Sequence, residues 1–246
     1  MKVDFIICGT QKGGTTALDA YLRQHPGTCM ATCKEVHFFD DESNFQAETV
    51  DYSKYHAAFD LKANGRLYGE ATPIYMYWYD APRRIWQYNP NIKLIVTLRN
   101  PIERAYSHWN MERQRNAETL SFGDALVRES VRRRESLPYQ HRVFSYIDRG
   151  FYSEQLRRLW AYFDKKQVLV LKHEDLKFKP RETLNSICDF LGLDRMMPPN
   201  PHEVHVGEYK SPIDEKEREL LQYIFEYEIR GLERLLGWDC NSWLAR

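Results

Sequence analysis

The sequence lacks the features that would tie a protein to a charged or apolar partner. Its 35 Lys and Arg residues balance its 35 Asp and Glu residues, so the formal net charge at pH 7 is zero. A chain without excess positive charge has no general attraction for nucleic acid or an anionic membrane. No run approaches the roughly 18 apolar residues of a membrane span, and the apolar run after Met1 is too short for a signal peptide. We therefore expect a cytoplasmic protein with no transmembrane segment and no nucleic-acid partner.

Paired cysteines are missing as well. The five cysteines are odd in number and scattered, with no C-x-x-C pair and no histidine at zinc-finger spacing: Cys8, Cys29, Cys33, Cys188 and Cys240. This pattern is typical of reduced thiols, and we expect no metal site.

The sequence does contain enough apolar material for a core, with 43% hydrophobic residues. Residues 93–98, Lys-Leu-Ile-Val-Thr-Leu, are nearly all apolar or β-branched, as in a central parallel strand. Helical periodicity covers 15–24, 122–133 and 213–236. This alternation predicts one α/β domain over residues 1–246, with a P-loop-like, mostly parallel central sheet flanked by helices.

A glycine-rich loop follows the first apolar run. Gly9 and Gly14 have the separation found in the triphosphate-binding loop G-x-x-x-x-G-K-[ST], but Thr15 stands where that loop needs its lysine, and Lys12 lies inside the loop instead. Such a strand, loop and helix predict an anion site at the helix N-terminus. The missing lysine disfavours a kinase or ATPase, and a plain glycine turn with a solvated lysine is the simpler alternative.

An acid and an imidazole stand close together in residues 32–40. If this segment is extended, alternation places Glu35 and His37 on one face and Val36 and Phe38 on the other. The pair is a candidate for acid–base chemistry. The alternative is a surface strand with a solvated glutamate and histidine.

A candidate ligand site also follows the strand at 93–98. Arg99 comes directly after it, and Ser107 lies on the helix expected to begin near Pro101. Ligands of open α/β sheets bind at the carboxyl ends of the strands, so both side chains could face a ligand there. Arg99 could instead be an ordinary ion-pair partner.

Taken together in their order, these motifs resemble one family, the sulfotransferases that use 3′-phosphoadenosine 5′-phosphosulfate (PAPS), and within it the branch of the heparan sulfate sulfotransferases and their bacterial relatives. The loop at residues 11–16 is similar to the family's 5′-phosphosulfate loop, residues 35–40 to its catalytic segment, and residues 98–107 to its 3′-phosphate motif. The resemblance spans nearly the whole chain.

The resemblance implies a role for each motif. Lys12 would stabilise charge on the oxygen that bridges sulfate and phosphate, Glu35 would be the catalytic base, and His37 would assist it. The residues implied in cofactor binding are Gln11, Lys12, Gly13, Gly14, Thr15 and Thr16 for the 5′-phosphosulfate, Arg99 and Ser107 for the 3′-phosphate, and Tyr152, Tyr209 and Lys210 for closure over the cofactor. Adenosine 3′,5′-bisphosphate would be the product, and no metal is expected.

The acceptor is left open by the sequence. It would offer a hydroxyl, or less readily an amine, and belong to a small molecule, a lipid or a glycan. Glu70 stands where the glycan-sulfating branch is expected to carry a lysine, and this carboxylate disfavours a polyanionic acceptor. Two other functions remain as alternatives, a P-loop phosphotransferase and a non-catalytic nucleotide-binding module. The sequence does not indicate an oligomeric state.

Overall fold

A computed structural model describes residues 2–60, 65–197 and 212–245. The chain forms two compact units, one of residues 1–98 and 158–205 and the other of residues 99–157 and 206–246. The first contains the sheet and the second contains helices. The expected single domain over 1–246 stays a prediction.

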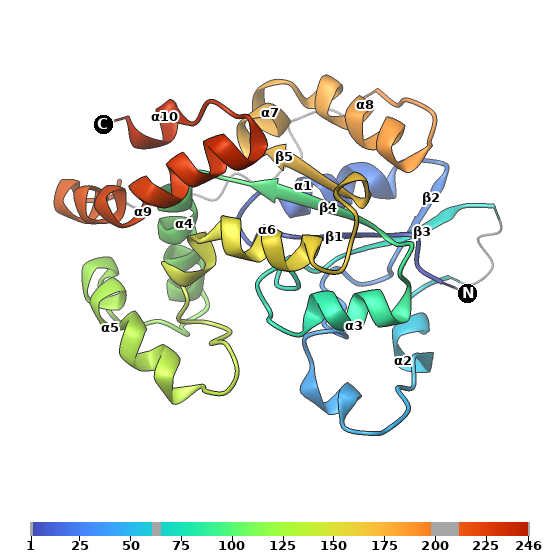
Figure 1. Ribbon diagram of the computed structural model, residues 1–246, viewed down its shortest axis with the longest axis horizontal. Coiled ribbons are helices and arrows are strands. Elements are labelled where there is room, and N and C mark those ends of the chain that lie inside the picture. The colour runs from blue at the N-terminus through green and yellow to red at the C-terminus, as the bar shows by residue number, and fades with distance from the viewer. Residues whose placement is uncertain (1, 61–64, 198–211, 246) are drawn as a thin grey trace. The chain divides into compact units, whose positions relative to one another are not determined.

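A five-stranded, entirely parallel sheet forms the centre of the first unit, in the order β2-β3-β1-β4-β5 (Figure 1). The strands are β1 (Phe5–Gly9), β2 (Thr28–Met30), β3 (Leu67–Ala71), β4 (Lys93–Leu98) and β5 (Val168–Lys172). β1 and β4 are almost completely buried because their residues are apolar or β-branched on both faces. The α/β class, the parallel sheet and the bounds of β4 are as predicted.

Helices of the first unit cover this sheet. Apolar side chains of α1, α7 and α8 pack with those of β1, β3 and β4 in one core cluster. The elements of this unit are α1 (Thr15–Arg23), the 3-10 helix η1 (Glu42–Phe45), α2 (Ser53–His56), α3 (Ala81–Tyr88), the 3-10 helix η3 (Lys165–Gln167), α7 (His173–Phe178) and α8 (Pro180–Leu191). Gly69 of β3 has a packing reason, since a Cβ there would lie 2.1 Å from Cζ of Phe5.

The second unit is built around α9. Glu228 of α9 accepts hydrogen bonds from the amide and hydroxyl of Ser153, and Arg218 pairs with Glu103 at 2.8 Å. Its elements are α4 (Pro101–Gln114), α5 (Phe122–Glu135), the 3-10 helix η2 (Asp148–Gly150), α9 (Glu215–Leu236) and α10 (Asn241–Leu244). α6 (Tyr152–Trp160) begins in this unit and leads the chain back into the first.

Candidate active site

The loop between β1 and α1 is held against the ends of two other strands. Thr10 donates from its amide and its hydroxyl to the carbonyl of Thr97, near the end of β4. Nδ1 of His173, the first residue after β5, lies 3.1 Å from the carbonyl oxygen of Gly13. A Cβ on Gly13 would lie 2.5 Å from the Thr97 carbonyl oxygen, so this position requires glycine. These contacts therefore fix the position of the loop at the carboxyl edge of the sheet.

The N-terminus of α1 is electrostatically open. The first turn of this helix contains no acidic residue, and its N-cap residue, Gly14, has no side chain that could cap the first amides. The helix dipole and the amides of the first turn favour an anion at this end. Gly14 supports the geometry with φ of 95°, which an L side chain rarely adopts.

The loop brings together all six residues predicted for the 5′-phosphosulfate. Gln11, Lys12 and Gly14 are half-buried, Gly13 and Thr15 are buried, and Thr16 is exposed. Lys12 has a left-handed backbone, with φ of 67°. The arrangement offers one ammonium group, two hydroxyls and the amides of a helix start.

The segment Glu35–Asp40, called the catalytic segment below, follows a different path from the expected one. Glu35 and His37 have φ of 64° and 55°, and no strand is assigned between residues 31 and 41. The expectation of an extended segment was therefore wrong. Three hydrogen bonds impose the observed path: from Glu35 N to the Ala71 carbonyl, from Val36 N to Thr72 Oγ1 and from Phe38 N to the Tyr75 hydroxyl.

The catalytic segment nevertheless places the two expected side chains together. His37 Nε2 lies 3.5 Å from Glu35 Oε2, and His37 Nδ1 lies 3.0 Å from Asp40 Oδ2. Asp40 is completely buried, whereas His37 and Glu35 are partly exposed. The three side chains form a chain from a buried carboxylate through an imidazole to an accessible carboxylate.

The charges of these three side chains stabilise one another. The bond to Asp40, followed by the contact with Glu35, raises the pKa of His37 to about 9. The contact with His37, followed by that with Lys34, lowers the pKa of Glu35 to about 2 despite its partial burial. Lys34 Nζ lies 2.5 Å from Glu35 Oε1. Glu35 is therefore ionised and His37 protonated at neutral pH.

Asp40 is the residue whose role the sequence did not reveal. The only available signal was its position three residues after His37. The loop follows β1, and the amide of Glu35 is bonded to the last residue of β3. Because β1 and β3 are adjacent parallel strands, the loop and the catalytic segment lie at the same edge of the sheet.

Glu70 does not face an acceptor, contrary to the reasoning from the sequence. It is completely buried, and it accepts hydrogen bonds from Tyr55 Oη at 2.8 Å and Thr72 Oγ1 at 2.6 Å. Burial raises its pKa to about 7. The argument against a polyanionic acceptor therefore loses its basis.

Three further predicted residues belong to the second unit. Arg99 is half-buried and follows the last residue of β4, and Ser107 is buried on α4. Tyr152 at the start of α6 donates from its hydroxyl to the Arg99 carbonyl at 2.9 Å. Its hydroxyl thus supports the backbone of another predicted residue. Tyr209 and Lys210 lie outside the described residues.

In the ranges 2–60, 65–197 and 212–245, no His, Cys, Asp and Glu side chains gather in a group of three that could hold a metal ion. No helix within those ranges has the length and apolar character needed to cross a membrane.

Known proteins match both the sequence and this fold. The model of the sulfotransferase domain family matches residues 2–206. Human heparan sulfate glucosamine 3-O-sulfotransferase 6 is 33% identical over 193 residues, which cover 78% of this chain and 53% of that protein. A human relative, heparan sulfate glucosamine 3-O-sulfotransferase 3B1, is 31% identical and covers 78% and 46%. The chain spans about half the length of these curated relatives.

Solved structures of sulfotransferases share this fold. A sulfotransferase from Alicyclobacillus acidocaldarius has a TM-score of 0.86 and 28% identity, with all of both chains covered. Mouse sulfotransferase SULT7A1 complexed with PAP has a TM-score of 0.61 over 96% of this chain and 88% of that one. At 16% identity it shows only the shared fold. By its sequence, its parallel sheet and the family match over residues 2–206, the chain belongs to the sulfotransferase family.

Proposed function

We propose that the protein transfers a sulfuryl group from PAPS to a hydroxyl, or less readily an amine, with Glu35 as the base. The observation that carries the proposal is the chain Asp40–His37–Glu35, which ends in an ionised, accessible carboxylate at the same sheet edge as the Lys12 loop. PAPS supplies the sulfuryl group and leaves as adenosine 3′,5′-bisphosphate. The other residues bind, orient and stabilise charge.

Glu35 accepts the acceptor's proton in this proposal. The acceptor oxygen forms a bond to sulfur, the bond between sulfur and the bridging oxygen breaks, and the acceptor's proton passes to Glu35. A pKa of about 2 makes Glu35 a weak base at rest. An oxygen that is already bonding to sulfur is strongly acidic, so a carboxylate suffices. Lys34, which contacts Glu35 Oε1, must release that oxygen to the acceptor, and this release makes Glu35 more basic.

The loop between β1 and α1 stabilises the leaving group. Negative charge develops on the bridging oxygen as the bond to sulfur breaks, and Lys12 offsets it. The amides at the start of α1, with Thr15 and Thr16, bind the 5′-phosphate. Arg99 and Ser107 bind the 3′-phosphate, and Tyr152, Tyr209 and Lys210 close over the nucleotide. These assignments follow from the family resemblance.

The acceptor is proposed as a class. The names of two relatives state that they act on a glucosamine of heparan sulfate. A glycan hydroxyl therefore belongs beside small-molecule and lipid hydroxyls in the test. The cytoplasmic location stays a prediction.

The proposal is tested by transfer of ³⁵S-labelled sulfate from PAPS to a panel of glycan, phenol and lipid alcohols. Glu35→Gln and Lys12→Ala should each lower kcat by about 100-fold or more, because each removes charge from the reacting atoms. The exposed Glu48→Gln is the matched control and should leave kcat unchanged. Full activity of Glu35→Gln would remove Glu35 as the base.

Nucleotide binding separates the alternative functions. Calorimetry should show adenosine 3′,5′-bisphosphate bound without Mg²⁺ and more tightly than ATP with Mg²⁺. The opposite preference would support a phosphotransferase. Bisphosphate binding without turnover on any acceptor would support a non-catalytic module.

A further inference from the structure

The catalytic segment has a backbone that needs external support. Two non-glycine residues with left-handed φ, Glu35 and His37, cost free energy and persist only where their surroundings hold them. The hydrogen bonds that the amides of residues 35, 36 and 38 donate to Ala71, Thr72 and Tyr75 hold this part of the segment. None of these three bonds reaches Asp40, the end of the segment that carries the buried carboxylate.

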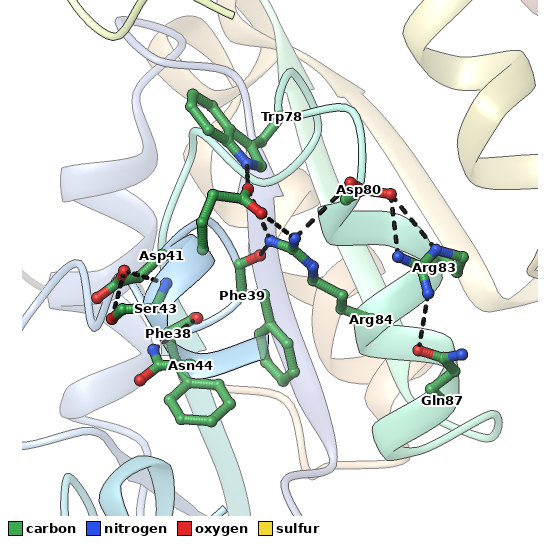
Figure 2. A network of polar contacts seen from close by, with 11 residues as sticks. Phe38, Phe39, Asp41, Ser43, Asn44, Trp78, Asp80, Arg83, Arg84 and Gln87 are labelled. Atoms are coloured by element: carbon green, nitrogen blue, oxygen red, sulfur yellow. Dashed lines mark hydrogen bonds and ion pairs between the residues drawn. The ribbon is translucent and has the colours of Figure 1, made fainter. Parts of the chain in front are cut away.

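Arg84 of α3 contacts the chain on both sides of Asp40. Its Nη1 donates to the carbonyl of Phe39 at 2.9 Å and to Oε1 of Glu42 at 3.0 Å, and its Nη2 binds Oε2 of Glu42 (Figure 2). Phe39 is the residue before Asp40, and Glu42 is the second residue after it. Because the Phe39 carbonyl and the Asp40 amide share one planar peptide, a hydrogen bond to that carbonyl fixes where the Asp40 backbone begins.

The surroundings of Arg84 restrict the movement of its guanidinium. Only 3% of Arg84 is exposed, and its guanidinium lies 4.2 Å from the centre of the Phe45 ring. Trp78 Nε1 donates to Glu42 Oε1 at 2.8 Å, which fixes the same carboxylate from a third direction. Buried, forked contacts of this kind restrict both partners more than a single exposed ion pair does.

We infer that Arg84, held by Glu42, is a positioning residue that sets Asp40 against His37 and so orients Glu35. Arg84 touches none of these three side chains through a described contact and acts through the peptide before Asp40 and the carboxylate after it. Its catalytic consequence rests on the proposed function, whereas its effect on His37 does not.

The competing interpretation is that Arg84 only stabilises the packing of η1 on α3. Both interpretations predict a lower melting temperature when Arg84 is replaced. They differ at His37, because a purely structural role leaves the distance between His37 and Asp40 unchanged. The titration of His37 is therefore the measurement that separates them.

The test compares Arg84→Met, Arg84→Lys and Glu42→Gln with wild type. The control is Arg83→Gln, which removes a neighbouring guanidinium on α3 that is 42% exposed and pairs with Asp80. Histidine side-chain NMR, with His37 assigned by a His37→Asn variant, gives the titration midpoint without any substrate. We expect the His37 midpoint to fall by about 1 pH unit or more in Arg84→Met and to stay unchanged in Arg83→Gln.

Groups other than Asp40 also act on His37. Glu35 lies on its other side, and Lys34 contacts Glu35, so some elevation of the His37 pKa remains when Asp40 is displaced. Arg84→Lys keeps one positive charge without the fork, and we expect an intermediate midpoint. If Arg84→Met does not fold, Glu42→Gln provides the same measurement.

Kinetics give the second readout. We expect kcat for sulfuryl transfer to fall about tenfold to 100-fold in Arg84→Met, with Kd for adenosine 3′,5′-bisphosphate within about twofold of wild type. An unchanged His37 midpoint in a folded Arg84→Met or Glu42→Gln protein would overturn the inference. A wild-type protein without sulfuryl transfer would overturn the proposed function and leave the His37 measurement intact.

Discussion

The buried carboxylate of Asp40 lies 3.0 Å from Nδ1 of His37, with Oδ2 as the contacting atom. This contact orients the imidazole so that Nε2 points to Glu35. A neutral asparagine could keep the hydrogen bond but not the charge. Replacing Asp40 by asparagine therefore separates the orientation of the imidazole from the stabilisation of its positive charge.

Asp40→Asn should lower the pKa of His37 from about 9 toward its ordinary value of 6.5. We expect kcat to fall about tenfold to 100-fold, because the imidazole that orients Glu35 is then held less firmly. The measurements are the NMR titration of His37 and kcat at pH 7.5 beside the Glu48→Gln control. A kcat equal to that of the control would contradict a role for the Asp40 charge.

The same contact gives a pH dependence of stability. Because the folded-state pKa of His37 is above its ordinary value, the charged imidazole stabilises the fold fully below pH 6.5, and this contribution is lost as the pH rises through about 9. Since 44% of the side chain is exposed, solvent screening reduces the contribution to about 1 kcal/mol. The free energies of unfolding of wild type and Asp40→Asn, measured with urea, should therefore converge by about this amount between pH 6 and pH 9.

Glu70→Gln should become more stable relative to wild type as the pH rises. Burial raises the pKa of Glu70 to about 7, so the protonated carboxyl stabilises the fold fully below pH 4.5, and this contribution is lost as the pH rises through about 7. A glutamine cannot ionise, and its carbonyl can accept from Tyr55 or Thr72. The free energy of unfolding of the variant relative to wild type should therefore rise by about 2 kcal/mol between pH 5 and pH 8.

Urea titrations at several pH values measure this difference. A free-energy difference that does not change with pH would mean that Glu70 is ionised throughout the range. The Thr72 hydroxyl, which bonds Glu70 and accepts from the Val36 amide, links the result to the catalytic segment.

The sequence allowed the sheet and the loop to be predicted because both depend on local pattern. The run at Lys93–Leu98 is apolar throughout, and glycines at 13 and 14 stand where a side chain would clash or strain the backbone. The catalytic segment was misread because its left-handed residues are imposed by partners more than 30 residues away, among them Thr72 and Tyr75.

Long-range contacts also explain what was missed. The carboxylate of Glu70 was expected to act against a polyanionic acceptor, because nothing near it in the sequence reveals its hydrogen bond with the Tyr55 hydroxyl. The roles of Asp40 and Arg84 depend on a contact between η1 and α3 across more than 40 residues. Periodicity carries no information about such contacts.

Arg99 and Lys12 should have separable effects on nucleotide binding. If Arg99 binds the 3′-phosphate, Arg99→Met should weaken binding of adenosine 3′,5′-bisphosphate about tenfold or more, because a charge-assisted contact is lost. Binding of adenosine 5′-monophosphate, which has no 3′-phosphate, should stay within about twofold. Ser107→Ala should show the same selectivity to a smaller degree, whereas Lys12→Ala should weaken both ligands.

Tyr152→Phe, which keeps the ring proposed to close over the nucleotide and removes only its hydroxyl, is the comparison variant for this experiment. Its lost hydroxyl leaves the Arg99 carbonyl without that donor, so it disturbs the Arg99 backbone without removing the guanidinium. Calorimetry with both nucleotides on all four variants gives the comparison. Equal weakening of the two nucleotides by Arg99→Met would mean that Arg99 does not recognise the 3′-phosphate. Weakening by Tyr152→Phe equal to that by Arg99→Met would assign the effect to the Arg99 backbone rather than to its charge.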